Sequence, residues 1–206
     1  MLSFAFQVFM GFFAIMNPFG NIPIFLGLVE DLDEPIRRQI ARKSTITAFV
    51  IVFLFALGGN LIFRLFGITL PAFRIAGGIL IFAIAYELLN GRKSQQHHLR
   101  GEETDDVTDP TAIAITPLGI PILAGPGTIA TAMSFVGNHT NPINIAIVIV
   151  IFLIMCLITY VFFIYSDKIL SKLGLSWISL LSRLMGLILA VIAVQMILEG
   201  IQQAFP

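Results

Sequence analysis

Two clusters of proline and glycine, each with polar neighbours, are the residues of this sequence best suited to binding a small solute. The first cluster covers residues 17–23 and the second covers residues 116–128, and each lies in a long apolar stretch. Proline lacks a backbone N–H and clashes with the carbonyl group four residues earlier, so it interrupts a helix and leaves backbone groups unpaired. The candidate binding residues in the two clusters are Asn17, Pro18, Gly20, Asn21, Pro23, Thr116, Pro117, Gly119, Pro121, Gly125, Pro126, Gly127 and Thr128.

Such interruptions offer ligands from the backbone as well as from side chains. A helix that begins inside a membrane presents unpaired N–H groups and about half a positive charge, which suits a carboxylate. The freed carbonyl oxygens and the side chains of Asn17 and Thr128 could accept hydrogen bonds from an ammonium group. We therefore expect a solute site near the middle of the membrane, where the two broken helices meet.

The elements that must position these clusters are membrane spans. Hydrophobic residues make up 57% of the 206 residues, charged residues make up 12%, and the mean hydropathy is +0.95. A soluble domain carries roughly a quarter charged residues. Here the apolar residues gather into stretches of about 20, the length that crosses a bilayer as a helix. Because only a helix satisfies its own backbone within one span, we predict an all-α polytopic membrane protein.

Stretches without charge predict six transmembrane helices. They cover approximately residues 2–29, 44–63, 75–89, 111–136, 143–164 and 184–198. The clusters of proline and glycine break the first and the fourth helix. Residues 92–110 are strongly hydrophilic, so the chain divides into a three-helix unit at 1–91, a cytoplasmic linker at 92–110 and a second three-helix unit at 111–206.

An internal repeat relates the two units. The third span contains Arg74-Ile-Ala-Gly77 and the sixth contains Arg183-Leu-Met-Gly186, and the two segments align without gaps for 18 residues. A second match aligns residues 18–24 of the first span with residues 117–122 of the fourth. Because each unit has three spans, the two repeats must enter the membrane with opposite topology. Inverted repeats of this kind are typical of secondary transporters.

The basic residues predict the orientation. Two of them, Arg64 and Arg74, lie on the side of the membrane that holds both termini. Ten lie in or beside the connections after spans one, three and five: Arg37, Arg38, Arg42, Lys43, Arg92, Lys93, Arg100, Lys168, Lys172 and Arg183. Basic residues favour the cytoplasmic side, so these connections should be cytoplasmic and both termini should lie outside the inner (plasma) membrane.

Arg74 and Arg183 occupy matching positions near the ends of the third and sixth spans. A charge within a span is costly and is usually functional or paired, so both are candidate accessory residues for the solute site. Because both lie close to a span end, we expect their side chains to extend to the membrane interface instead.

Several function classes do not fit the sequence. The net charge is zero, with 12 basic and 12 acidic residues, which argues against nucleic-acid binding. The aspartates lie in or beside connections and the histidines lie in connections, so no intramembrane protease site is formed. Cys156 is the sole cysteine, which excludes a zinc site built on cysteines. We expect no enzymatic activity, no cofactor and no metal.

Two segments resemble a known family. Met16-Asn-Pro-Phe-Gly-Asn-Ile-Pro-Ile-Phe25 and Ala124-Gly-Pro-Gly-Thr-Ile129 are similar to the signature segments of the MarC family, bacterial and archaeal inner-membrane proteins with six spans. The resemblance covers essentially the whole chain. The family includes SnatA-type transporters of small neutral amino acids and is grouped with the LysE-like exporters. The resemblance therefore implies a lipid-embedded transporter of small neutral amino acids or related metabolites.

The residues leave alternatives beside this one. A membrane protein that binds or assembles without transporting, and a channel of unknown substrate, would carry the same spans. A proton and a sodium ion are both candidate coupling ions for a transporter, and a homo-oligomer is a candidate assembly. The pair of small residues Gly186 and Ala190 suits close helix packing within one protomer or between two.

Overall fold

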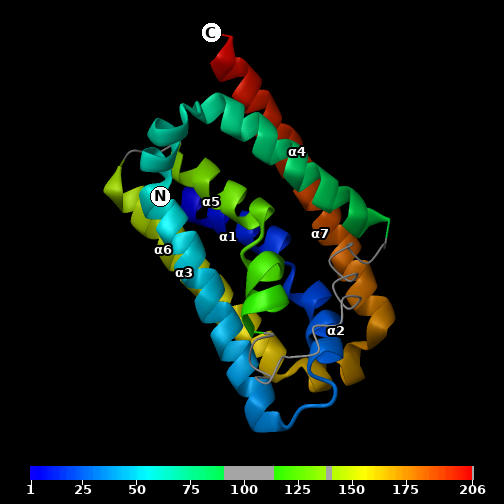
Figure 1. Ribbon diagram of the computed structural model, residues 1–206. Coiled ribbons are helices and arrows are strands. Elements are labelled where there is room, and N and C mark those ends of the chain that lie inside the picture. The colour runs from blue at the N-terminus through cyan, green and yellow to red at the C-terminus, as the bar shows by residue number, and fades with distance from the viewer. Residues whose placement is uncertain (91–113, 138–140, 206) are drawn as a thin grey trace.

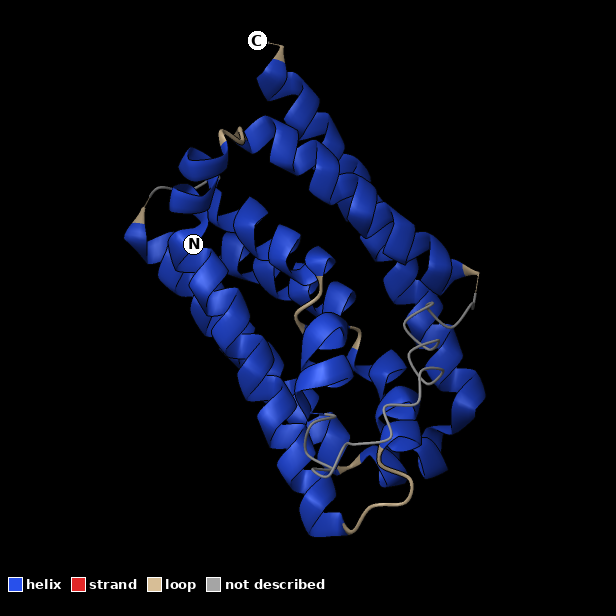
Figure 2. Ribbon diagram, in the orientation of Figure 1, coloured by secondary structure: helices blue, strands red, loops and turns tan. Residues whose placement is uncertain are grey.

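The computed structural model describes residues 1–90, 114–137 and 141–205. Every regular element in these ranges is a helix (Figure 2), which confirms the predicted all-α class for this part of the chain. The predicted linker at 92–110 lies outside the described residues.

The first unit contains four helices: α1 (Leu2–Met16), α2 (Pro18–Leu28), α3 (Glu34–Phe66) and α4 (Leu70–Leu89). Local chemistry explains where α3 ends and where α4 begins. Gly67 has a left-handed φ of 64°, a conformation that glycine adopts without steric cost. The hydroxyl of Thr69 caps α4 by accepting a hydrogen bond from the N–H of Ala72 at 3.4 Å.

The part of the chain predicted as the second unit begins with η3 (Ile115–Leu123), a distorted segment of the π type, and continues with α5 (Pro126–Gly137), α6 (Pro142–Ile164) and α7 (Ser166–Ala204). Asn141 caps α6, because its side-chain oxygen accepts a hydrogen bond from the N–H of Ile143 at 3.0 Å. Gly174, with φ 75° and ψ 160°, is non-helical and kinks α7 near its beginning.

Five stretches of the described chain are long and apolar enough to cross a membrane: α1 with α2, most of α3, α4, α6 and α7. The fourth predicted span is divided between η3 and α5, which have 9 and 12 residues. Neither reaches the roughly 20 residues that a crossing helix needs. Five of the six predicted spans thus correspond to long apolar stretches, and the fourth corresponds to two short helices.

Two helices extend well beyond the predicted spans. Helix α3 begins at Glu34, ten residues before the start of the second predicted span, and α7 begins at Ser166, 18 residues before the sixth. The extra turns carry Arg, Lys, Glu, Leu and Gln, which favour helix in water. The apolar stretch marks where a helix meets lipid and not where the helix ends.

The helices form three layers (Figure 1). Helices α1 and α5 lie side by side in the middle, with α2 and η3 continuing that layer toward one end. One outer layer is α3 packed on α6, and the other is α4 packed on α7. The interrupted segments are therefore covered on two sides by continuous helices. This cover matters because unpaired backbone groups are not tolerated against lipid.

Glycines let α4 and α7 pack closely along an antiparallel pair. A Cβ on Gly78 of α4 would lie 2.8 Å from the carbonyl oxygen of Ala193. A Cβ on Gly200 of α7 would lie 2.9 Å from the carbonyl oxygen of Pro71. Such distances leave no room for a side chain, so the absence of Cβ atoms sets the separation of the two helices.

The outward faces of the helices are apolar. Leu54, Leu57 and Leu61 of α3 and Val150 and Leu157 of α6 are all exposed. In water such a surface would promote aggregation, whereas in a bilayer it faces acyl chains. Both termini lie at one end of the molecule, and the turns after α2 and α6 lie at the opposite end (Figure 1).

Candidate functional site

Asn17 forms the first helix break. Helix α1 ends at Met16 and α2 begins at Pro18, and Asn17 between them has φ 39° and ψ 66°. It is the one non-glycine residue with a positive φ in the described part of the chain. Asparagine tolerates this left-handed conformation better than other residues with a Cβ. Pro18 follows at the first position of α2, where its missing N–H costs no helical hydrogen bond.

Two asparagine side chains hold this break together. The side-chain oxygen of Asn17 accepts a hydrogen bond from the N–H of Gly20 at 3.2 Å, which caps α2. The amide nitrogen of Asn21 donates to the carbonyl oxygen of Met16 at 2.7 Å, which satisfies the end of α1. Both asparagines are buried. They satisfy one N–H group and one carbonyl group that a broken helix would otherwise leave unpaired inside the membrane.

Pro23, which we had expected to widen this break, does not. It lies inside α2, and the helix continues through it to Leu28. Pro23 is in the second turn of α2, so the carbonyl group four residues before it lies near the start of the helix. Few helical hydrogen bonds precede that point, so the proline disturbs few of them. The predicted interruption at residues 17–23 is therefore confined to Asn17.

The second break is spread over the nine residues from Thr116 to Ala124. Thr116 and Ile120 have extended conformations inside η3, with φ/ψ of −131°/123° and −131°/126°. Each residue directly precedes a proline, and proline disfavours the helical conformation of the residue before it. The N–H of Ala124 then donates to the carbonyl oxygen of Gly119 at 2.9 Å, a bond spanning five residues. Ala124 is itself non-helical and ends the segment.

Helix α5 starts from this distorted segment in the same way as α2 starts from Asn17. Its first residue is Pro126, and the N–H of Ile129 donates to the carbonyl oxygen of Gly125 at 3.1 Å. Gly127 and Thr128 of its first turn are buried. The half-helices α2 and α5 thus both begin with a proline that directly follows the break.

The two helix starts lie close together in the middle layer (Figure 2). A Cβ on Gly127 would lie 3.0 Å from Cδ1 of Ile15, which is two residues before Asn17, and 2.8 Å from Cδ1 of Ile84. On the other side, a Cβ on Gly20 would overlap the Asn17 amide and lie 2.8 Å from the hydroxyl oxygen of Ser182. The glycines therefore permit the start of α5 to lie against the end of α1 and against α4, and the start of α2 to lie against α7.

The positions of the helix starts differ from the sequence match between the first and fourth spans. Pro18 is the first residue of α2 and Pro126 is the first residue of α5, so the two prolines occupy the same position in their helices. The sequence match had paired Pro18 with Pro117 instead. Arg74 and Arg183 are 109 positions apart and Pro18 and Pro126 are 108 apart, so the structural pairing also agrees with the repeat in the third and sixth spans.

The two predicted accessory arginines have different surroundings. Arg183 is exposed on α7, in agreement with a side chain that extends outward. Arg74 has 0% exposure, and the expectation that it reaches the interface is wrong. It is buried because α4 packs against α7 at this level, where a Cβ on Gly200 would lie 3.3 Å from Cβ of Arg74.

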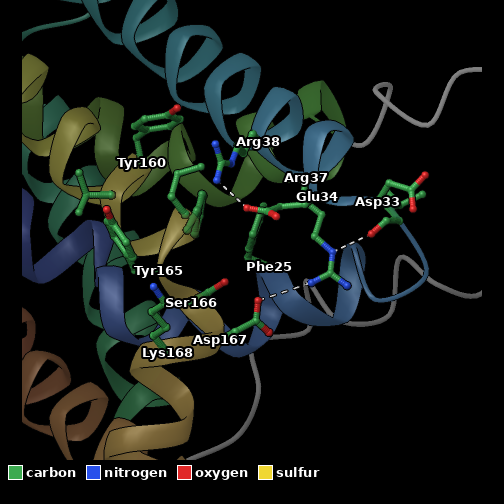
Figure 3. A pocket seen from close by; sticks show the side chains of 14 residues that line it. Phe25, Asp33, Glu34, Arg37, Arg38, Tyr160, Tyr165, Ser166, Asp167 and Lys168 are labelled. Carbon is green, nitrogen blue, oxygen red and sulfur yellow. Dashed lines mark hydrogen bonds and ion pairs between the residues drawn. The ribbon is translucent and has the colours of Figure 1, made fainter.

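A charged pocket at one end of the molecule was not predicted from the sequence (Figure 3). It has a volume of about 700 Å³ and lies between α2, the start of α3, the end of α6 and the start of α7. Phe25 and Phe163 stack in its wall with ring centroids 4.4 Å apart. Its charged lining residues are Asp33, Glu34, Arg37, Arg38, Asp167 and Lys168.

Arg37 joins three segments around this pocket. Its guanidinium donates to the carbonyl oxygens of Leu32 and Glu30, both at 2.8 Å, and contacts the carboxylate of Asp167 at 3.6 Å. Arg38 pairs with Glu34 at 2.6 Å within α3. The predicted topology puts residues 30–38 and 167–168 on the same side of the membrane, and that was the available signal for this cluster.

Comparisons with known proteins agree with these features. The family described as MarC family integral membrane protein matches residues 2–205. The membrane protein YvbG of Bacillus subtilis is 47% identical over 206 residues, which cover 100% of this chain and 98% of YvbG. A UPF0056 membrane protein of Pyrococcus abyssi is 40% identical over 198 residues, 96% of this chain and 94% of the relative.

A UPF0056 membrane protein of Methanocaldococcus jannaschii is 37% identical over 203 residues, 98% of each chain. No solved structure matches the chain. The match covers both helix breaks, both units and the charged pocket. With this full-length similarity and its multi-pass helical fold, the chain belongs to the MarC (UPF0056) family of integral membrane proteins.

Proposed function

We propose that the chain is a secondary transporter of small neutral amino acids or related small metabolites. The observation that carries this proposal is the meeting of two broken helices in the middle layer, with α2 and α5 both starting there. Two helix N-termini supply N–H groups and positive potential for a carboxylate. The carbonyl groups and hydroxyls around the breaks supply acceptors for an ammonium group.

The proposal includes an inverted repeat of the three-helix units 1–91 and 111–206. Each layer of the structure pairs the corresponding spans of the two units: α1–α2 with η3–α5, α3 with α6, and α4 with α7. The paired helices α4 and α7 run antiparallel, as units of opposite topology require. Movement of one unit against the other would alternate access to the central site.

The charged pocket would be the cytoplasmic opening of this transport path. It lies at the end opposite both termini, where the basic residues predict the cytoplasm. Its charges of both signs suit a zwitterion, and its volume of about 700 Å³ admits a small amino acid with its water. The ion pair between Arg37 and Asp167 links α3 to α7, so its opening would accompany movement between the two units.

Counterflow in proteoliposomes tests the proposed function. Vesicles loaded with unlabelled L-alanine should accumulate labelled L-alanine transiently, and imposed proton and sodium gradients identify the coupling ion. Asn17→Ala should abolish counterflow. Asn141→Ala is a matched control, because Asn141 also caps a helix but lies in an exposed turn. Leakage without counterflow would indicate a channel, and no flux of any small amino acid would reject the proposal.

Reporter fusions test the orientation independently. A fusion at Pro206 should report an external position and a fusion near Gln96 a cytoplasmic one. A cytoplasmic signal at Pro206 would reverse the proposed topology and place the charged pocket outside. Cross-linking in native membranes at increasing protein dilution would establish whether the transporter is a homo-oligomer.

A further inference from the structure

Arg74 is a buried charge without a hydrogen-bond partner among the described residues. Its side chain has 0% exposure, and its Nε and both terminal nitrogens are unpaired in the part of the chain that the structure describes. A guanidinium remains charged under physiological conditions, and burying it unpaired is strongly unfavourable. An anion that binds beside it would remove this penalty.

The packing of α4 against α5 places Ser134 at the level of Arg74. A Cβ on Gly137 would lie 2.5 Å from Cδ1 of Leu70, and a Cβ on Gly77 would lie 3.0 Å from Cβ of Ala130. Leu70, Arg74 and Gly77 share one face of α4, because residues four and seven positions apart lie above one another. By the same spacing, Ala130, Ser134 and Gly137 share the facing side of α5. Arg74 and Ser134 therefore lie at about the same level of the two helices, where Arg74 also borders Gly200 of α7.

A row of buried hydroxyl groups connects this level to the helix break. Thr128, Thr131 and Ser134 lie one turn apart on α5 and are 3%, 3% and 7% exposed. Thr128 belongs to the first turn of α5, beside the break. The hydroxyl of Thr131 donates to the carbonyl oxygen of Gly127 at 2.9 Å. The row provides polar groups between the central site and Arg74 in surroundings that are otherwise apolar.

Glu199 is the carboxylate whose charge acts on Arg74, but within the described part of the chain it forms no ion pair with it. Glu199 of α7 interacts with Arg74 through space, but its carboxylate accepts a hydrogen bond from the side chain of Gln195 at 3.1 Å. No ion pair joins Glu199 to Arg74 among the described residues. The guanidinium therefore has no direct anionic partner among the described residues.

We propose that Arg74 and Ser134 form a second carboxylate-binding subsite, separate from the helix starts at the central break and on the side of that break toward the termini. A planar guanidinium matches the two oxygens of a carboxylate with paired N–H donors, and a serine hydroxyl can donate a further hydrogen bond. Arg183, the aligned residue of the second unit, is exposed, so the subsite exists in one unit only. The proposal rests on the transport function proposed above.

Thermal unfolding of the full-length protein in detergent tests this subsite without requiring transport. Acetate carries the carboxylate alone, and acetamide and chloride at equal concentration and ionic strength serve as neutral and anionic comparisons. Acetate should raise the melting temperature of the wild type by roughly 2–4 °C near saturation. Arg74→Gln should lose this shift. Arg42→Gln, which removes an exposed arginine of α3, should retain it.

Ser134→Ala keeps the buried charge and decides the matter if Arg74→Gln does not fold. It should reduce the acetate shift by at least half. An equal shift in all variants, no shift in the wild type, or an equal shift with chloride would overturn the subsite. L-Alanine counterflow separates the two proposals. An acetate shift that depends on Arg74, without counterflow, would reject amino-acid transport alone. Counterflow in the wild type and in Ser134→Ala at the same rate, with no acetate shift in the wild type, would reject the subsite alone.

Discussion

The two helix breaks reach the same result by different means. The first is a single residue, Asn17, whose left-handed backbone and capping side chain join α1 to α2 with hydrogen bonds on both sides. The second extends from Thr116 to Ala124 and depends on the backbone conformations that precede two prolines. Both breaks end in a helix that begins with proline.

This difference indicates a division of roles. The first break is compact and its backbone groups are paired by side chains, so it is the more rigid of the two. The second break has a bond spanning five residues and non-helical positions, so it can change shape by changing few backbone angles. We expect the first break to be sensitive to side-chain substitution and the second to substitution of proline.

Substituting Asn17 should have the largest effect. Asn17→Ala places a Cβ without a polar group in the left-handed region and removes the cap of α2, at a cost of roughly 2–3 kcal/mol in the free energy of unfolding. Asn17→Gly relieves the backbone cost and should recover most of that stability. Unfolding in a mixed-micelle titration measures both. Equal destabilisation by Ala and Gly would show that the left-handed backbone is not what selects asparagine.

Gly127 should rank next, because it lies where the two breaks meet. Gly127→Ala would place a Cβ 2.8 Å from Ile84 and 3.0 Å from Ile15, and this overpacking should cost roughly 1–2 kcal/mol. Gly27→Ala on α2 is the matched control, since no atom lies within 4 Å of its new Cβ. That change should stabilise the protein by up to about 1 kcal/mol through helix propensity. Equal effects at Gly27 and Gly127 would contradict the close approach.

The breaks could be predicted from the sequence because their causes are local. Proline acts on its own residue and on the one before it, so the sequence alone indicates an interruption near Pro18, Pro117 and Pro121. The same local rule failed at Pro23, because its effect depends on how far it lies from the helix start. The kink at Gly174 was likewise missed, since glycine permits a bend without requiring one.

Features that depend on packing could not be predicted. The burial of Arg74 arises from the contact of α4 with α7 and α5, and nothing in the spacing of residues around Arg74 distinguishes it from the exposed Arg183. The charged pocket joins Arg37 to Asp167, which are 130 positions apart in the chain. The sequence match of Pro18 with Pro117 did not indicate that Pro18 begins a helix whereas Pro117 lies inside the distorted segment η3.

Asn21 offers a smaller test of how the first break is held. Asn21→Ala removes the hydrogen bond from its amide to the carbonyl oxygen of Met16 and should cost about 1 kcal/mol. Asn90→Ala removes a similar bond, from the amide to the carbonyl oxygen of Tyr86 at 2.9 Å, at an exposed helix end. The exposed carbonyl is satisfied by water, so Asn90→Ala should cost less. Equal losses would mean that water also reaches Met16.

Substituting Pro121 of the second break should affect stability least, and its main effect should be on transport. Pro121→Ala removes the restriction on Ile120 and restores a backbone N–H, so this segment can approach a regular helix. We expect a change of less than about 1 kcal/mol in stability, because relief of the restricted backbone is offset by the greater conformational freedom of the unfolded chain. The rate of L-alanine counterflow should nevertheless fall about tenfold, since a regular helix would no longer present an open helix start.

Pro23→Ala, inside the continuous α2, should reduce counterflow less. If both variants slow transport equally, the non-helical conformation before Pro121 is not what transport requires, and the role given to the second break is wrong.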